Sequence, residues 1–284
     1  MTSKSQTMHP VDDRFAPSDI ARIVSETFID RVDYHEEIES TNSRATQLAA
    51  AASANTVPDD RSCVLVLTEN QTAGRGRGAN RWWSTRGALT FSVLIRPNAV
   101  DLPTDRWPQL SLTAGLAVCE AIESLLSDVT VGIKWPNDVY LSGRKVCGIL
   151  VEAGGGQPGS GVIGNIVFGI GVNVHNSAEN APHELRDKVI ALSDVATGTI
   201  RRVDVLVAIL QQLASRLNRL GADVAGLQEA WCRRCLLTGR TVEIELPSRR
   251  LIGLCRGIDH DGALIVETDA GRERCLSGVV MRID

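Results

Sequence analysis

The chain has 284 residues, of which 43% are hydrophobic and 23% are charged, and this is typical of a soluble globular protein with one large domain and a smaller one. A net charge of -4 leaves no basic surplus for nonspecific nucleic-acid binding, and the sequence contains neither a secretory signal nor an apolar run long enough to cross a membrane. The seven cysteines are scattered and odd in number, so we expect reduced thiols and a cytoplasmic protein.

The first half of the chain is predicted to mix strands and helices. Residues 1–17 are expected to form a disordered leader. Hydrophobic periodicity and cap residues then predict, in chain order, a helix over 18–27, a strand over 31–38, an alanine-rich helix over 43–54, strands over 62–69 and 88–95, and a helix over 107–126.

The second half continues in mixed order and ends in a strand-rich tail. The predicted elements are strands over 130–135, 139–141, 146–151 and 163–174, helices over 206–220 and 227–237, and short strands over 241–245, 252–259, 263–267 and 273–276. This order favours an α+β fold, with a mixed β-sheet and flanking helices. We expect the main domain to span residues 18–237 and a small C-terminal barrel to span residues 238–284.

The strongest local signal is a loop of alternating glycine and arginine, Gly74-Arg75-Gly76-Arg77-Gly78. Glycines allow backbone amides to approach a ligand closely, and arginines offer forked, permanently charged donors for carboxylate or phosphate. On composition alone, a mobile basic surface loop or a nucleic-acid-binding loop is an equal alternative. The position of the loop between two apolar strands favours a ligand-binding loop, because a rigid sheet can aim it.

The segment Lys134–Asp138, with sequence K-W-P-N-D, places a lysine, an amide and a carboxylate within five residues after a predicted strand. Proline fixes its own φ and favours an extended residue before it, so the strand is expected to end rigidly. A polar turn that only caps the strand is the simpler alternative.

Three further segments combine small and polar residues. Lys145 lies three residues before Gly148 and can reach along the backbone opening that this glycine makes. The segment Gly169–Asn173 has two glycines in an apolar strand, which indicates that something approaches its main chain. The triplet Ser40–Asn42 precedes a helix, and an N-cap is its default role.

Other patterns carry no function. The segment Gly159–Gly164 fits G-x-G-x-x-G, but a strand rather than a helix follows it, so we interpret it as a hairpin loop. The sequence has no G-x-x-x-x-G-K-[ST], which excludes a P-loop kinase. Cys232 and Cys235 form a lone C-x-x-C without a second pair or a nearby histidine, and we interpret them as two small side chains one helical turn apart.

Five segments taken in order, S-T-N, Q-T-A-G-R-G-R, K-W-P-N-D, K-x-x-G-I-L and G-I-G-V-N, resemble the biotin protein ligase family. Each is weak alone, but their order and spacing are specific. The resemblance implies a catalytic domain akin to class II aminoacyl-tRNA synthetases, followed by an SH3-like barrel. It also implies an enzyme that forms biotinyl-5'-AMP from biotin and ATP with Mg²⁺, then transfers biotin to a lysine of a biotin carboxyl carrier protein or domain.

The resemblance also implies roles for individual residues, by motif match. Those expected at the biotin site are Ser40, Thr41, Asn42, Gln71, Gly74, Arg75, Lys145, Gly148 and Gly169. Those expected at the ATP site are Arg77, Trp82, Lys134, Asn137, Asp138 and Asn173, with Asn137 and Asp138 also as metal ligands. The residues expected to act in catalysis are Arg75, Arg77, Lys145 and Asp138.

The sequence departs from the common bacterial pattern in the glycine loop. Many members read G-R-G-R-x-G-R-x-W, whereas Ala79 and Asn80 here replace the second Gly-Arg pair. Arg81 is the candidate substitute for the missing arginine.

The chemistry of the residues agrees with the resemblance. A carboxylate must attack the α-phosphate of ATP, so two anions have to be brought together, and this is a task for Arg75, Arg77 and Lys145 with Mg²⁺. A free lysine has a pKa of about 10.4, so presenting it neutral at pH 7 costs about 4.6 kcal/mol. Asp138 is the candidate to accept or orient that proton. The glycine loop is expected to order over the reactive anhydride when ligand binds.

Three alternatives remain. A lipoate ligase has a related fold and the same adenylation logic. A biotin-sensing repressor needs an additional DNA-binding domain, but only 39 residues precede Ser40, fewer than the roughly 50 of an independent domain, so we expect no nucleic-acid or membrane partner. A non-catalytic biotin-binding module would not need the cations. We expect a monomer or a weak homodimer.

Overall fold

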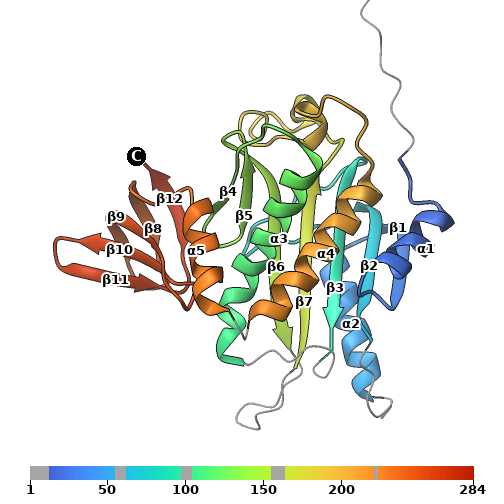
Figure 1. The fold of residues 1–284 in the computed structure, drawn as a ribbon, viewed down its shortest axis with the longest axis horizontal. Coiled ribbons are helices and arrows are strands. Elements are labelled where there is room, and N and C mark those ends of the chain that lie inside the picture. The colour runs from blue at the N-terminus through green and yellow to red at the C-terminus, as the bar shows by residue number, and fades with distance from the viewer. Residues whose placement is uncertain (1–12, 55–61, 97–103, 155–163, 221–222) are drawn as a thin grey trace, which may run out of the picture.

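A computed structural model describes residues 13–54, 62–96, 104–154, 164–220 and 223–284, arranged as a large mixed sheet with helices and a smaller all-β domain (Figure 1). Most of the predicted Gly159–Gly164 hairpin loop lies outside the described residues. The strands on either side of it are antiparallel neighbours in the sheet, and no helix follows Gly164.

The large sheet has seven strands and is almost entirely antiparallel. Its order is β1 (Arg31–Ile38), β2 (Val64–Gln71), β3 (Ala88–Ile95), β7 (Asn165–Asn173), β6 (Arg144–Gly154), β5 (Asp138–Leu141) and β4 (Val131–Lys134). Only β1 and β2 are parallel to each other, and the helix α2 (Thr41–Ala54) connects them. The predicted α+β class with a mixed sheet is confirmed.

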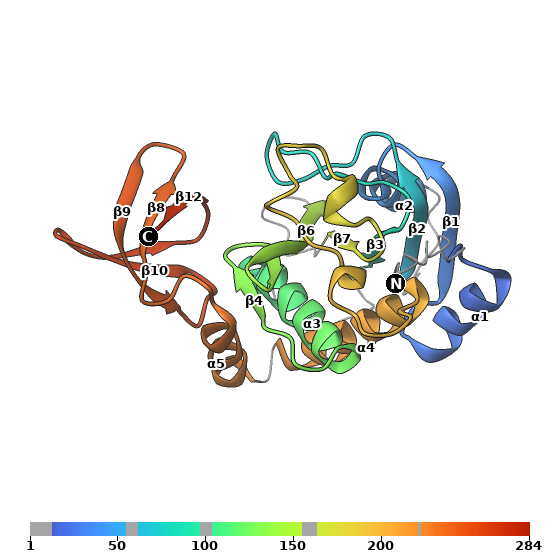
Figure 2. The same cartoon turned by 90° about the horizontal axis from the view of Figure 1, so that it is seen from above.

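Helices cover the two faces of this sheet unequally. The helices α1 (Pro17–Glu26), α3 (Leu110–Leu125) and α4 (Arg202–Leu220) lie on one face, and α2 (Thr41–Ala54) lies on the other, as Figure 2 shows. Short 3-10 helices span Thr104–Gln109, Ala178–Asn180 and Leu192–Asp194. Because α2 covers only one end of its face, the rest of that face is left for a site.

The alternation of side chains along β7 shows how the two faces differ. Phe168 and Ile170 belong to the main core beneath α3 and α4. On the opposite face, Val167 packs with Ala45 of α2, and the next outward position is Gly169. Successive residues of a strand point to opposite faces. Strand β7 therefore presents large apolar side chains to the core, and at Gly169 it presents no side chain to the opposite face.

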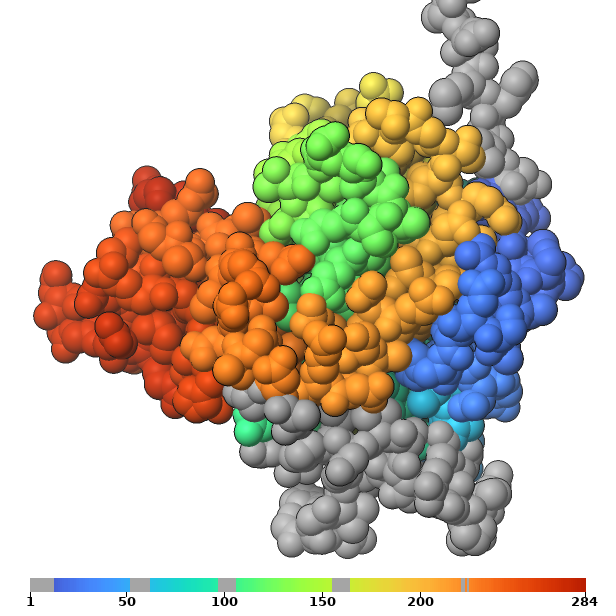
Figure 3. Space-filling model, viewed as in Figure 1, coloured from blue at the N-terminus to red at the C-terminus, as the bar shows by residue number. Residues whose placement is uncertain are grey.

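The small domain follows α5 (Val224–Arg234) and has five antiparallel strands. In the space-filling view its orange-to-red atoms lie on one side of the large domain (Figure 3). The order of these strands in the sheet is β11 (Gly271–Cys275), β10 (Leu264–Thr268), β9 (Arg250–Ile258), β8 (Thr241–Glu245) and β12 (Val279–Ile283). The sequence prediction missed β12, because its partner is the first strand of the domain and such a long-range pairing leaves no local pattern.

The interpretation of the two cysteines of α5 needs one correction. The predicted helix over 227–237 ends earlier, at Arg234, so Cys232 lies in its last turn and Cys235 follows it as the C-cap. A hydrogen bond from the thiol of Cys255 lowers the pKa of Cys235 to about 6, against the opposing effect of burial. Both side chains contact the small domain, since Cys232 Sγ also donates to the carbonyl of Ile258 at 3.2 Å.

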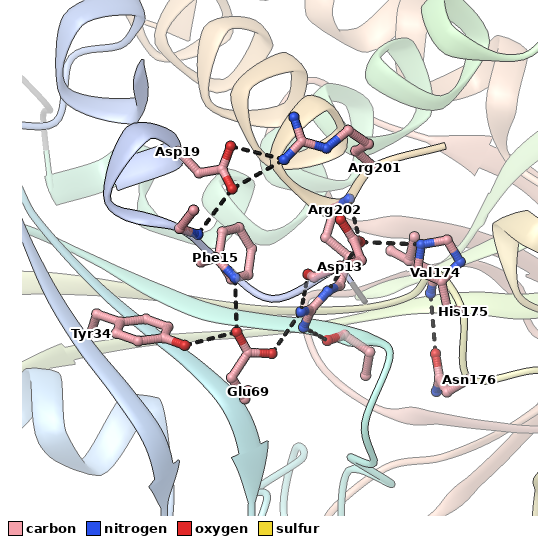
Figure 4. A network of polar contacts seen from close by, with 12 residues as sticks. Asp13, Phe15, Asp19, Tyr34, Glu69, Val174, His175, Asn176, Arg201 and Arg202 are labelled. Atoms are coloured by element: carbon pink, nitrogen blue, oxygen red, sulfur yellow. Dashed lines mark hydrogen bonds and ion pairs between the residues drawn. The ribbon is translucent and has the colours of Figure 1, made fainter. Parts of the chain in front are cut away.

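The N-terminal segment is anchored from Asp13 onward, so the expectation of a leader through residue 17 was wrong for its last part (Figure 4). Phe15 is 7% exposed and belongs to the core. The buried Arg202 joins Asp13 to Glu69 of β2, at 3.3 and 2.6 Å. Burial raises the pKa of Asp13, but hydrogen bonds from His175 and the Arg202 amide, with the Arg202 charge, lower it below its usual value. The polar composition of this segment suggested disorder, but the ion pairs of Asp13 and Glu69 with the buried Arg202 hold it against the large domain.

Candidate active site

A cavity of about 550 Å³ lies on the open face of the large sheet, beside the N-terminus of α2. Cavities of this size hold small molecules and cofactors. The structure brings most of the predicted residues into its lining, namely Ser40, Thr41, Asn42, Gln71, Arg75, Arg77, Trp82, Lys134, Asn137, Asp138, Lys145, Gly148 and Gly169. Residues more than 120 positions apart in the sequence therefore meet at one place.

The floor of the cavity is a chain of polar side chains at the start of α2. Ser40 does act as an N-cap, since its Oγ accepts from the amide of Ser43 at 3.4 Å. Thr41 donates its amide to Gln71 Oε1 at 2.7 Å, and the two side chains lie 3.1 Å apart. Ser92 Oγ of β3 lies 2.7 Å from Thr41 Oγ1. The triplet is therefore both a cap and a source of neutral hydrogen-bonding groups.

Glycines make room on the sheet for two side chains. A Cβ on Gly171 would lie 2.6 Å from Trp82 Nε1, and one on Gly148 would lie 3.1 Å from the same ring. Gly148 and Gly171 are register partners on β6 and β7, so they form a flat seat for the indole. A Cβ on Gly169 would lie 2.7 Å from Asn42 Cγ. The predicted close approach to these strands is confirmed, and the groups that approach are Trp82 and Asn42.

One wall of the cavity is strongly cationic. Among the described lining residues, Arg75, Arg77, Arg81, Lys134 and Lys145 carry positive charge, and Asp138 is the one carboxylate. Lys145 Nζ lies 2.6 Å from Asp138 Oδ1. Burial lowers the pKa of Lys134, with Lys145 adding to the effect and Asp138 opposing it, and burial also lowers the pKa of Arg77. Cations held in a partly buried place with too few carboxylates favour an anionic ligand.

The small domain completes the cavity. Gly278, Val279 and Val280, in and just before β12, line it. Arg77 Nη1 donates to the carbonyl of Gly278 at 2.6 Å, so the glycine loop touches the small domain. Trp135 Nε1 also crosses to this domain and donates to the carbonyl of Gly262 at 3.1 Å. Sequence analysis did not point to these three lining residues, because β12 was not predicted.

Comparison with known proteins identifies the family. The model of the biotin/lipoate A/B protein ligase family matches residues 38–173, and that of the biotin protein ligase C terminal domain matches residues 237–281. A biotin--[acetyl-CoA-carboxylase] ligase of Mycobacterium tuberculosis is 32% identical over 271 residues, which cover 94% of each chain. The chain belongs to the biotin protein ligase family.

Other members agree with this family membership. The bifunctional ligase/repressor BirA of Bacillus subtilis is 32% identical over 246 residues, which cover 86% of this chain and 71% of that protein. The biotin protein ligase of Aquifex aeolicus, solved in complex with biotin and ATP, is 26% identical with a TM-score of 0.73, over 90% of this chain and 100% of that one. The resemblance and the fold class predicted from the sequence are confirmed. Among the described residues, no helix combines the length and apolarity needed to cross a membrane.

Two residues that the family resemblance assigned to the site do not line the cavity of this biotin protein ligase. Asn173 is 1% exposed and donates its amide to the carbonyls of Lys145 and Ile190, at 3.4 and 3.2 Å. It therefore supports the strand that carries Lys145. Gly74 lies behind the cavity, where a Cβ would meet the carbonyl oxygen of Trp82 at 2.7 Å. We therefore attribute this glycine to close packing of the backbone in this structure.

Asn80, which replaces an arginine of the common pattern in the glycine loop, has a structural role in this family member. Asn80 Nδ2 donates to the carbonyl of Arg77 at 3.0 Å, and its own carbonyl accepts from the amide of Gly76 at 2.9 Å. Asn80 thus closes the turn of the loop. Arg81 lines the cavity and bridges to Arg75 through the backbone.

Proposed function

We propose that this chain joins biotin to ATP as biotinyl-5'-AMP and then transfers the biotin to a lysine of a carrier protein. The observation that carries the proposal is a single cavity with a neutral hydrogen-bonding floor and a cationic wall. The relatives from Mycobacterium tuberculosis and Bacillus subtilis are named as ligases, and the Aquifex aeolicus ligase was solved with both biotin and ATP.

The floor suits the neutral ureido ring of biotin. A ureido group offers two N–H donors and one carbonyl acceptor, and Thr41, Gln71 and Ser40 supply complementary hydroxyl and amide groups. These side chains are almost completely buried, at 2%, 8% and 3% exposure. Buried polar groups that pair with a ligand discriminate strongly, because an analogue without the partner atoms leaves them unsatisfied. We therefore assign the ring of biotin to the floor and its carboxylate to the cationic wall.

The cationic wall suits the triphosphate and the developing charge on its α-phosphate. Lys145, Lys134 and Arg77 surround one end of the cavity, and preorganised cations act most strongly where water is excluded. Asn137 donates its amide NH₂ to the Ile149 carbonyl at 2.8 Å. Its Oδ1 is then available as a metal ligand, and the next residue, Asp138, supplies a carboxylate. These two oxygen donors fit Mg²⁺ held jointly with phosphate oxygens, and the ion would neutralise phosphate charge.

Asp138 changes partner in this account. In this structure its carboxylate is paired with Lys145 at 2.6 Å. When phosphate or carboxylate draws the ammonium of Lys145 away, the carboxylate becomes available to the incoming carrier lysine. We assign to Asp138 the orientation and deprotonation of that amine in the transfer step.

The glycine loop and the small domain together shield the intermediate. Arg77 is the described loop side chain that hydrogen-bonds to the small domain, through the carbonyl of Gly278. A mixed anhydride is hydrolysed when water reaches it, so contact between loop and domain would protect it. The carrier lysine would enter where the cavity opens to solvent.

The test is incubation of the purified chain with MgATP, biotin and a biotin carboxyl carrier domain, read by intact-protein mass spectrometry. We expect the mass of one biotinyl group on one carrier lysine, together with release of pyrophosphate. Parallel incubation with lipoate should give no modification. Transfer of lipoate in place of biotin would assign the chain to the lipoate branch, and transfer of neither would overturn the proposal.

A further inference from the structure

A chain of polar contacts runs from the cavity floor to Glu152, a residue of β6 that has no role in the steps above. Asn42 Nδ2 donates to Glu152 Oε2 at 2.9 Å and to the carbonyl of Leu150 at 3.2 Å. The guanidinium of Arg75 forms a bidentate pair with the same carboxylate: Nη1 donates to Oε2 at 3.1 Å, and Nη2 donates to Oε1 at 2.5 Å. One carboxylate thus holds a side chain of the floor and a side chain of the glycine loop.

The bonds to Asn42 determine which way its amide faces. Both acceptors lie on the side of Nδ2, so Oδ1 is turned toward Ser92, whose Oγ lies 2.6 Å away. Ser92 in turn contacts Thr41, and Thr41 contacts Gln71. An amide is a donor at one end and an acceptor at the other, so its orientation sets the direction of every hydrogen bond further along such a chain.

Glu152 itself stays outside the main cavity. It lines a separate groove against α2, together with Thr46, Ala49 and Ala50. Its carboxylate is paired with Arg75, whose Nη2 lies 2.5 Å from Oε1. Any effect of Glu152 on the reaction must therefore pass through its two partners.

We propose that Glu152 is a positioning residue for biotin, acting through Asn42 on the floor and through Arg75 on the glycine loop. Arg75 is then an anchor that ties the loop to β6, and the substrate anions are met by Arg77, Lys134 and Lys145 instead. The guanidinium fork is already matched to a carboxylate in the bidentate geometry that such pairs prefer. This inference rests on the proposed ligase function and adds a residue to it.

A double-mutant cycle tests the inference, with the dissociation constant of biotin measured by calorimetry for Glu152→Ala, Arg75→Ala and the double variant. Losing a charge-assisted hydrogen-bond partner should raise the constant about 10- to 100-fold in each single variant. Because both variants break one unit, the double variant should be no worse than the weaker-binding single one. Losses that multiply would show that Arg75 binds substrate directly, and an unchanged constant in Glu152→Ala would equally overturn the proposal.

Kinetic readouts separate positioning from general damage. Glu152→Gln keeps an oxygen acceptor for Asn42 but loses the charge, so its KM for biotin should lie between those of wild type and Glu152→Ala. The KM for ATP and kcat at saturating biotin should stay near wild type. The control is Glu273→Ala, which removes a similar two-pronged pair with Arg249, at 3.2 and 2.7 Å, in the small domain and should change nothing. A wild-type chain without biotin-dependent pyrophosphate exchange refutes the proposed function, whereas an active wild type with unaltered Glu152 variants refutes this inference alone.

Discussion

Replacing Gly171 by alanine should displace the indole of Trp82 and weaken ligand binding. The new Cβ would lie 2.6 Å from Trp82 Nε1 and 2.7 Å from Cζ2, whereas carbon atoms in contact normally lie about 3.5–4.0 Å apart. The ring must therefore retreat by about 1 Å. Strand β7 is held by neighbours on both sides, so the side chain rather than the sheet is expected to move, and the cavity is the space open to it.

The size of the effect follows from the cost of overpacking, which is typically about 1–3 kcal/mol. If that energy is expressed in binding, the dissociation constants of biotin and ATP should rise about 5- to 150-fold. Calorimetric titration measures these constants, and thermal unfolding measures how much of the cost falls on stability instead. Gly198→Ala is the matched control, because a Cβ there would meet nothing within 4 Å.

A second variant makes the reasoning refutable. If the effect of Gly171→Ala passes through the indole, it should nearly vanish in a Trp82→Ala background, where the obstructing ring is absent. Equal losses in the presence and absence of the indole would show that the alanine acts on the backbone of β7. Unchanged binding and stability in Gly171→Ala would show that the glycine is not needed for this seat.

Four further predictions concern other parts of the molecule. Arg202→Met should lower the free energy of unfolding by about 3–5 kcal/mol in a denaturant titration, because two largely buried carboxylates, with side chains 6% and 13% exposed, lose their cationic partner, and a loss below 1 kcal/mol would contradict that role. Asp138→Asn, which keeps an oxygen donor for the metal, should slow transfer to the carrier in single-turnover assays more than it slows adenylation, and equal losses would remove the base role. Arg77→Gly should release adenylate that labels bystander proteins, detectable with streptavidin, whereas full retention would argue against the shield. Cys235 should be alkylated faster than Cys147, whose pKa burial raises, with a rate that increases with pH around a midpoint of about 6 as the thiolate forms, and equal labelling would refute this.

Local pattern was enough to predict most of the fold. The strand over 88–95 was predicted with the bounds that the structure has, because its apolar run ends abruptly at both sides. The mixed order of strands and helices correctly favoured the α+β class. Elements held by distant partners were harder to foresee. The strand β12 forms by pairing with β8, which is distant in sequence. Residues 13–16 are ordered through contacts with Arg202, which is also distant in sequence.

The site was predictable where one short segment carries several functional groups. The segments beginning at Gly74 and Lys134 were singled out by composition, and Ser40–Asn42 was assigned to the site by the family resemblance. All three segments contribute to the lining of the cavity. Glu152 was missed because it is a single carboxylate in a strand, and only its two partners reveal a role. Asn173 was assigned to the ATP site by motif match, whereas in this structure its amide donates to backbone carbonyls and the residue does not line the cavity.

The cationic wall is proposed to bring two anionic substrates together for reaction. Biotin-dependent exchange of labelled pyrophosphate into ATP, compared between wild type and Lys145→Met, measures this first step. We expect exchange by wild type that requires biotin, and a fall of about 100-fold or more in the variant, as for removal of one preorganised charge-stabilising donor. Undiminished exchange by Lys145→Met, or exchange by wild type in the absence of biotin, would contradict the account.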